Sequence, residues 1–178
     1  ARIGKAAAVF ERLKPIWKSG TIRNDMKLRL YQSIVLPTTI YAGETWKRTA
    51  AISNRLDVFH RRCLRTILGI SWRDHITNEE LMKRAGMDDL SDIVTVRRRR
   101  FAGHVMRLPK ERPAKVAMRW TPAGGKRKRG RPKTTWRKTF QEDLQEMGID
   151  WSSAQSAATD RSRWRALVAR CSNRSGRN

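Results

Sequence analysis

The side chains best suited to chemistry in this sequence belong to a basic run, Lys126-Arg127-Lys128-Arg129-Gly130-Arg131-Pro132-Lys133. An extended segment of this kind fits the narrow minor groove of A·T-rich DNA, whose negative potential attracts arginine side chains. Gly130 has no side chain to collide with the groove floor, and Pro132 keeps the backbone extended. The run predicts contact with the minor groove or with phosphates through Arg127, Arg129, Gly130, Arg131 and Lys133.

Within this run, Arg129-Gly130-Arg131-Pro132 resembles the core of an AT-hook. The alternatives are a solvated basic linker and a nuclear-localisation patch. Residues 121–133 also contain two prolines and three glycines, so we expect an extended linker there and no packed element.

A second basic group, Arg97-Arg98-Arg99-Arg100, lies in a segment with helical periodicity. Consecutive residues of a helix spread over all its faces, so at least one of these side chains must pack its stem against the core and extend its charge to solvent. We expect the group to contact phosphates, with Arg137 as a further candidate. Trp120 and Trp136 flank the linker and are candidates for stacking on bases, with core packing as the alternative.

No complete catalytic or metal-binding set is visible in the sequence. Asp88 and Asp89 are adjacent carboxylates of the type that binds Mg²⁺ in a polymerase centre, but no strand pattern flanks them, so we expect a surface loop or a helix cap. His60 and Cys63 form half of a zinc pattern that has no second half of suitable spacing. We therefore expect no catalytic residue, no metal site and no cofactor in this chain.

The charge of the chain indicates a polyanionic partner. Its 40 Lys and Arg residues outnumber its 16 Asp and Glu residues, which gives a net charge of +24. RNA or DNA is the expected partner, because arginine matches phosphates and base edges with two hydrogen bonds. An anionic membrane is the weaker alternative, because no apolar run approaches the ~20 residues of a membrane span.

The two cysteines, Cys63 and Cys171, are far apart and suit a reducing compartment. No signal peptide is visible, so we expect the nucleus and the cytoplasm. The chain begins inside an amphipathic stretch, and we expect it to be a piece of a longer polypeptide.

Hydrophobic residues at three- and four-residue steps predict helices along the chain, and no alternation typical of strands is present. Near the N-terminus, Met26, Leu30 and Ile34 are expected to face inward with Tyr31 and Val35, and Pro37 to interrupt or kink the helix. The expected helices are 2–18, one from Asn24, 50–68 ended by Gly69, 78–85 between Thr77 and Gly86, 92–107 capped by Ser91, 114–119, one capped by Thr134 or Thr135, and two capped by Asp150 and Asp160.

These patterns predict an all-α protein made of small helical bundles joined by an extended basic linker. The expected parts are two helical regions at 1–70 and 71–120, the linker at 121–133, a helical subdomain at 134–171 and a disordered tail at 172–178.

Several blocks of the sequence resemble non-LTR retrotransposon (LINE-type) reverse transcriptases. Tyr41-Ala42-Gly43-Glu44-Thr45-Trp46 is similar to the signature that follows the polymerase core of this family. The other matching blocks, in the family's order, are Leu56–Arg73 with its continuation to Glu79, Arg99–Arg107, Gly130–Trp136 and Asp160–Trp164. This sequence departs from the family in having Ala42 where many relatives carry glycine, and in lacking the zinc knuckle of some relatives.

The resemblance implies that residues 1–70 correspond to the thumb and the remainder to the C-terminal extension. The endonuclease, the fingers and the Mg²⁺-binding palm would lie upstream in the same polypeptide. The fragment itself would be no enzyme, but would bind template RNA, primer or target DNA during target-primed reverse transcription, as part of a ribonucleoprotein. The competing hypotheses are a free-standing basic DNA-binding protein with an AT-hook-like segment, an enzyme in its own right, and a decayed fragment without function.

Overall fold

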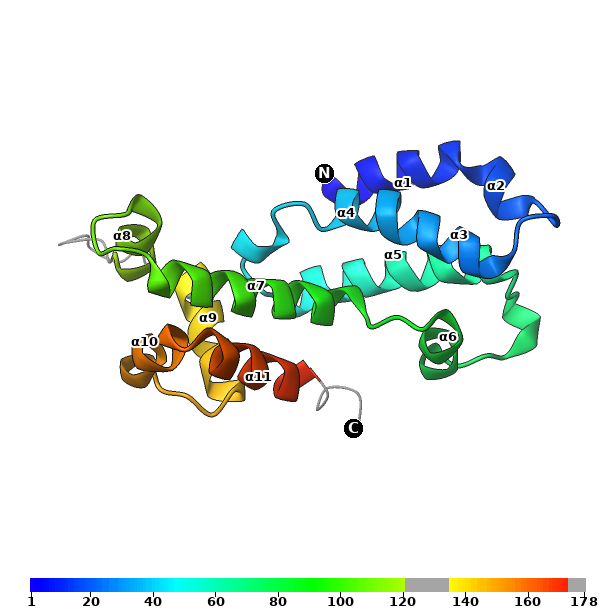
Figure 1. Ribbon diagram of the computed structural model, residues 1–178. Coiled ribbons are helices and arrows are strands. Elements are labelled where there is room, and N and C mark those ends of the chain that lie inside the picture. Colours follow the sequence, from blue (N-terminus) through cyan, green and yellow to red (C-terminus); the bar gives the residue numbers. More distant parts are fainter. Residues whose placement is uncertain (121–134, 173–178) are drawn as a thin grey trace, which may run out of the picture. The chain divides into compact units, whose positions relative to one another are not determined.

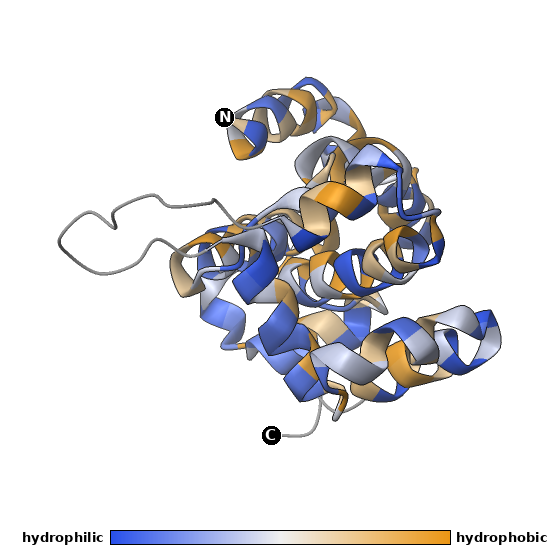
Figure 2. Cartoon of the chain, turned by 90° about the vertical axis from the view of Figure 1, so that its left-hand side faces the viewer, coloured by the Kyte–Doolittle hydropathy of each residue, from blue (hydrophilic) through white to orange (hydrophobic). Residues whose placement is uncertain are grey.

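The computed structural model describes residues 1–120 and 135–172 (Figure 1). All regular elements in these ranges are helices, which confirms the all-α fold class. The expected linker at 121–133 lies outside the described residues. Orange and blue segments alternate along the helices in Figure 2, as expected for amphipathic helices that bury one face.

The chain forms two compact units. Unit 1 comprises residues 1–43 and 50–93, and unit 2 comprises 44–49 and 94–178. These units differ from the regions expected at 1–70 and 71–120. The difference arises because Leu81 packs in the core of unit 1, while Glu44 is joined to Trp136 in unit 2 by a hydrogen bond.

Unit 1 is built around a cluster of buried aromatic and aliphatic side chains that includes Phe10, Trp17, Tyr31, Leu64 and Leu81. Phe10 and Trp17 stack with ring centroids 5.1 Å apart, and Trp17 Nε1 donates a hydrogen bond to the Phe10 carbonyl. The elements that supply the cluster are α1 (Arg2–Arg12), α2 (Lys14–Lys18), α3 (Asn24–Leu30), a π-helical turn (Tyr31–Val35), α4 (Leu36–Thr39), α5 (Ala50–Leu68) and α6 (Asn78–Ala85).

The N-terminal helices differ from the sequence prediction in two ways. The expected helix at 2–18 ends at Arg12 and restarts at Lys14, because Pro15 has no amide hydrogen to donate and fits best at the start of a helix. Met26 and Ile34 are exposed, so the expectation that they face inward was wrong. The buried positions are Lys27, Tyr31 and Val35, on a neighbouring stripe of the same helical segment.

Proline is accommodated in that segment without ending it. Pro37 lies in the first turn of α4, and the preceding turn, Tyr31–Val35, is a π-helix. The wider π-helical turn accommodates the missing hydrogen bond, because proline has no amide hydrogen to donate.

The later helices of unit 1 end at glycines as predicted, and α6 begins at the predicted polar cap. Gly69 and Gly86 adopt the left-handed conformation after α5 and α6, and the Thr77 hydroxyl accepts from the Glu80 amide. The helix α7 (Leu90–Arg107) begins one residue before the expected cap, Ser91. The Ser91 amide donates instead to the buried carboxylate of Asp57 on α5, at 2.9 Å.

Unit 2 consists of the remainder of α7 from Val94, with α8 (Pro113–Arg119), α9 (Trp136–Glu146), α10 (Trp151–Thr159) and α11 (Arg161–Ser172). Its core includes Phe140, Leu144, Met147, Trp164 and Val168. The predicted caps of α9 and α11 are confirmed by their hydrogen bonds. Thr135 Oγ1 accepts from the Lys138 amide, and Asp160 Oδ1 accepts from the Ser162 and Arg163 amides.

Candidate nucleic-acid interface

The basic group on α7 is divided between the core and the surface. Arg98 and Arg99 are 1% and 3% exposed, whereas Arg97 and Arg100 are exposed. Arg98 donates from Nε and Nη2 to the two carboxylate oxygens of Asp143, at 2.5 and 2.9 Å. Two of the four arginines expected to contact phosphates therefore have their charge directed into the protein.

Arg98 belongs to a cluster of five charged residues within unit 2. Arg99 binds Glu146 and lies 3.6 Å from Asp143, and Arg48 binds Glu146 at 2.8 Å. Buried charges are tolerated only when they are paired and hydrogen-bonded. The cluster joins the segment before α5 to α7 and α9, so Arg98 and Arg99 hold the fold of the unit and we leave them out of the candidate interface.

The exposed face of α7 presents a line of basic side chains. Arg97, Arg100, His104 and Arg107 follow one another at three- and four-residue steps, so they lie on one side of the helix. We call these four residues the α7 stripe. Arg97, Arg100 and His104 are exposed, and the buried residues of this helix, such as Ala102 and Val105, lie on the other side.

The C-terminal end of the α7 stripe lies in a strongly positive environment. Arg107 Nη1 donates to the Ala158 carbonyl at 2.8 Å, and its Nε has no acceptor among the described residues. Partial burial, and then the charges of Arg161 and Arg165, hold the pKa of Arg107 below its usual range. The positive charges of Arg161 and Arg165 act on Arg107, so a phosphate would be stabilised at this place.

Arg161 and Arg165 were not identified as binding candidates from the sequence, although their spacing was a usable signal. Arg161 and Arg165 are four residues apart in the last helix, so they share a face. Their approach to Arg107 depends on the packing of α11 on α7, which periodicity alone does not give.

The remaining predicted binding residues lie in different environments. Arg137 is half-buried, donates to the Arg119 carbonyl and lies 5.1 Å from the ring centroid of Trp151. Trp120 is 65% exposed. Trp136 is held in place, since it stacks on Phe140 and its Nε1 donates to the Glu44 carbonyl at 2.9 Å. The candidates Arg127, Arg129, Gly130, Arg131 and Lys133 lie outside the described residues.

Asp89, one of the two adjacent carboxylates considered for metal binding, has a structural role. Asp88 and Asp89 precede α7, as expected for a loop or cap, and the Asp89 carboxylate forms a two-bond ion pair with Arg61 at 3.0 and 2.5 Å. His60 is fully buried and its Nδ1 lies 2.7 Å from the Tyr31 hydroxyl, while burial raises the pKa of the Cys63 thiol to about 12. Among residues 1–120 and 135–172, no three such side chains are grouped to hold a metal ion.

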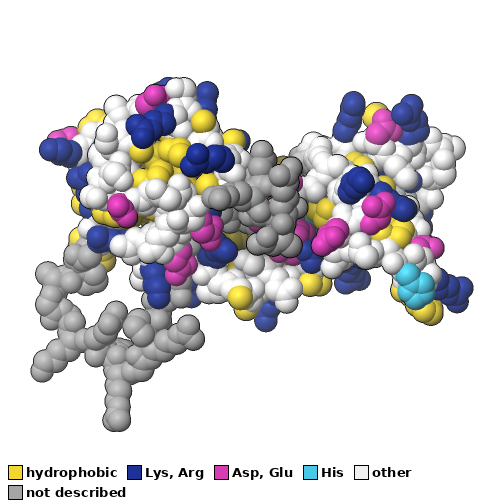
Figure 3. All heavy atoms as spheres, turned by 90° about the horizontal axis from the view of Figure 1, so that it is seen from below, with side chains coloured by type: hydrophobic (Ala, Val, Ile, Leu, Met, Phe, Trp, Pro, Cys, Tyr) yellow, Lys and Arg dark blue, Asp and Glu magenta, His cyan; other side chains and the backbone are white. Residues whose placement is uncertain are grey.

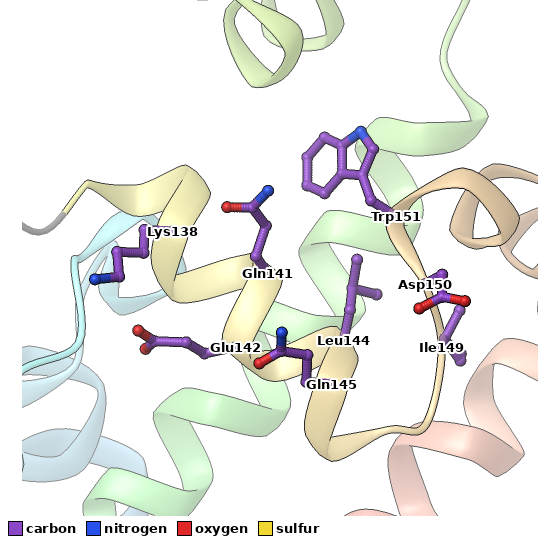
Figure 4. A pocket seen from close by; sticks show the side chains of 8 residues that line it. All are labelled: Lys138, Gln141, Glu142, Leu144, Gln145, Ile149, Asp150 and Trp151. Carbon is purple, nitrogen blue, oxygen red and sulfur yellow. The ribbon is translucent and has the colours of Figure 1, made fainter.

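A pocket of about 380 Å³ lies between α9 and the start of α10 (Figure 4). Gln141 and Trp151 extend to the same side of this pocket, and Lys138 is its cationic residue. The carboxylates of Glu142 and Asp150 also line it, so its charge disfavours a phosphate. We therefore place the candidate interface on the α7 stripe and not in this pocket.

On the face drawn in Figure 3, the surface charge is mixed. Figure 3 shows Lys and Arg side chains distributed over the visible face, with Asp and Glu side chains between them. In the part of the chain that the structure describes, no helix has the length and apolar character needed to cross a membrane.

Comparison with known proteins gives one informative similarity. No family model matches the chain, and no solved structure matches it. A transposon-derived protein of Caenorhabditis elegans is 28% identical over 158 residues, covering 82% of this chain and 56% of that protein. The chain thus spans little more than half the length of this relative, and the similarity supports a transposon origin.

Proposed function

We propose that this chain is the nucleic-acid-binding C-terminal region of a non-LTR retrotransposon reverse transcriptase. In this proposal it holds template RNA, primer or target DNA, while an upstream palm with its Mg²⁺ performs polymerisation. The ordered sequence blocks and the transposon-derived relative support the origin. The observation that carries the binding role is the α7 stripe with Arg161 and Arg165 beside its C-terminal end.

The distribution of charge supports this assignment. Acidic side chains such as Asp89, Asp143 and Glu146 are already paired with cations inside the two units. With a net charge of +24, Lys and Arg side chains remain in large excess, and Arg97 and Arg100 are among the exposed ones. Such an excess attracts polyanions. Bound phosphates then lower the repulsion between the like charges of the chain.

A salt titration tests the proposal. We expect the 178-residue chain to bind a short RNA–DNA hybrid, with an affinity that falls steeply as salt is added. The double substitution Arg97→Gln and Arg100→Gln should lower the slope of log K against log salt by ~1 for each lost phosphate contact. Fluorescence anisotropy of a labelled hybrid at several salt concentrations measures both quantities.

A charge-matched control separates a local interface from bulk attraction. Lys5 and Arg12 are exposed on α1, and changing both to glutamine removes the same charge elsewhere. Equal losses in the two double variants would leave only non-specific attraction, and no binding by the wild-type chain at low salt would refute the proposal.

A further inference from the structure

Trp72 is a large apolar side chain held almost entirely in solvent. Its side chain is 79% exposed, more than any other large hydrophobic residue that the structure describes. It lies in a 3-10 turn, Trp72–Asp74, between α5 and α6. Neither of the two tryptophans named from the sequence as stacking candidates, Trp120 and Trp136, is as open.

The turn that carries Trp72 is held by several hydrogen bonds. The Ser71 hydroxyl accepts from the Arg73 amide at 3.0 Å, and the Asp74 carboxylate accepts from the Ser71 amide at 2.6 Å. Arg65 on α5 donates to the Ile76 carbonyl at 3.0 Å, which attaches the far side of the turn to a long helix. The indole is therefore presented on a fixed support, which lowers the entropy lost when a ligand binds it.

The surroundings of the ring match a nucleotide better than an apolar partner. The Arg73 guanidinium lies 5.5 Å from the ring centroid, and Ser71, Asp74 and His75 are also exposed. A protein-docking face would place further apolar side chains around the ring. A single aromatic ring with an arginine beside it provides a π-face for a base and a cation for its phosphate.

We propose that Trp72 is a stacking site for an unpaired base of a bound nucleic-acid strand. The inference rests on the proposed function, because it adds a base contact to phosphate contacts made elsewhere on the chain. The indole supplies stacking area, and Arg73 supplies the neighbouring positive charge. Stacking of this kind tolerates any base, because every base has a π-face.

Binding of single strands with and without bases tests the inference. The probes are a labelled oligothymidylate and an abasic strand of the same length, titrated into the 178-residue chain by fluorescence anisotropy. Trp72→Ala should weaken binding to the oligothymidylate by about 5- to 150-fold, the range found for loss of one base–aromatic stack. Binding to the abasic strand should not change, and Trp72→Phe should retain most of the affinity.

A matched control is available on the same unit. Val58 on α5 is an apolar side chain, 57% exposed, without a π-face, and Val58→Ala should leave both affinities unchanged. Because Trp72 is exposed, Trp72→Ala should also leave the thermal unfolding midpoint unchanged.

The outcomes separate this inference from the function on which it rests. A wild-type chain that binds neither strand nor any duplex would overturn both. A wild-type chain that binds, with Trp72→Ala unaffected or equally weakened on the abasic strand, would overturn the stacking site alone. Trp72-dependent binding to vesicles of anionic lipid, without dependence on bases, would identify a membrane partner and overturn it as well.

Discussion

The contact between Gly103 on α7 and Trp164 on α11 leads to the strongest stability prediction. A Cβ atom added at Gly103 would lie 2.2 Å from Trp164 Nε1 and 2.6 Å from Cδ1. Trp164 is 2% exposed, and its Nε1 donates to the Arg99 carbonyl at 3.0 Å. The indole has no room to remain where it is, so Gly103→Ala must displace it.

The expected loss can be worked out from these contacts. Removing a buried tryptophan from a core costs ~3–5 kcal/mol, which sets the scale for displacing the ring of Trp164. Alanine in place of glycine within a helix raises the free energy of unfolding by ~0.5–1 kcal/mol, because alanine has the better helix propensity. Gly103→Ala should therefore lower the free energy of unfolding by about 2–4 kcal/mol.

Urea unfolding followed by far-UV circular dichroism measures this loss. Gly4 on α1 is the matched control, because no atom lies within 4 Å of a Cβ built there. Gly4→Ala should stabilise the chain by ~0.5–1 kcal/mol, the propensity gain without the collision.

A double-mutant cycle identifies the collision partner. In a chain that already carries Trp164→Ala, the space beside Gly103 is open, so Gly103→Ala should become neutral or stabilising. A Gly103→Ala chain as stable as the wild type would refute the reasoning. Equal destabilisation with and without the indole would show that the clash involves another group.

Two further predictions concern buried charged and titratable groups. Asp143→Asn leaves the Arg98 guanidinium buried without a carboxylate and should cost about 3–5 kcal/mol in urea unfolding, whereas Glu146→Gln, at a side chain that is 46% exposed, should cost less. Burial lowers the pKa of His60 from 6.5 to about 4, so between these values the unfolded chain binds a proton that the folded chain does not. Stability should therefore fall by about 3 kcal/mol as the pH is lowered from 6.5 to 4, and unfolding curves of His60→Gln should show a smaller fall in this interval.

Local structure was largely predictable because it depends on residues close in sequence. The helix 50–68 was predicted from its hydrophobic stripe, and it forms with the same bounds. Gly69 and Gly86 adopt the left-handed conformation that marks the end of a helix. In each case the hydrogen bonds and the buried face lie within a few residues of the signal, so the sequence alone contains the necessary information.

The candidate site was less predictable because its residues are sorted by distant partners. Periodicity shows that the four arginines from Arg97 to Arg100 cannot all face solvent. It does not show that Asp143, forty-five positions beyond Arg98, supplies a buried carboxylate. Instead of extending to solvent, the guanidinium groups of Arg98 and Arg99 are both buried, with Arg98 paired to the buried Asp143 and Arg99 to the partly exposed Glu146.

Several sequence blocks that suggested a family have packing roles in unit 2. Gly103 provides the space for Trp164, and Asp160 caps the helix that carries this tryptophan. Trp136 of another block donates to the carbonyl of Glu44.

These contacts separate two kinds of position on the same helices. A substitution at Gly103 or Trp164 disrupts the packing of unit 2, so its effect on binding should follow its effect on stability. Arg97 and Arg100 are exposed and do not belong to the core, so their loss should change binding and its salt dependence while the unfolding free energy stays nearly constant. The blocks therefore contain both residues that build the scaffold, such as Gly103 and Trp164, and exposed side chains, such as Arg100 and Trp72, and the exposed ones are those to test for nucleic-acid binding.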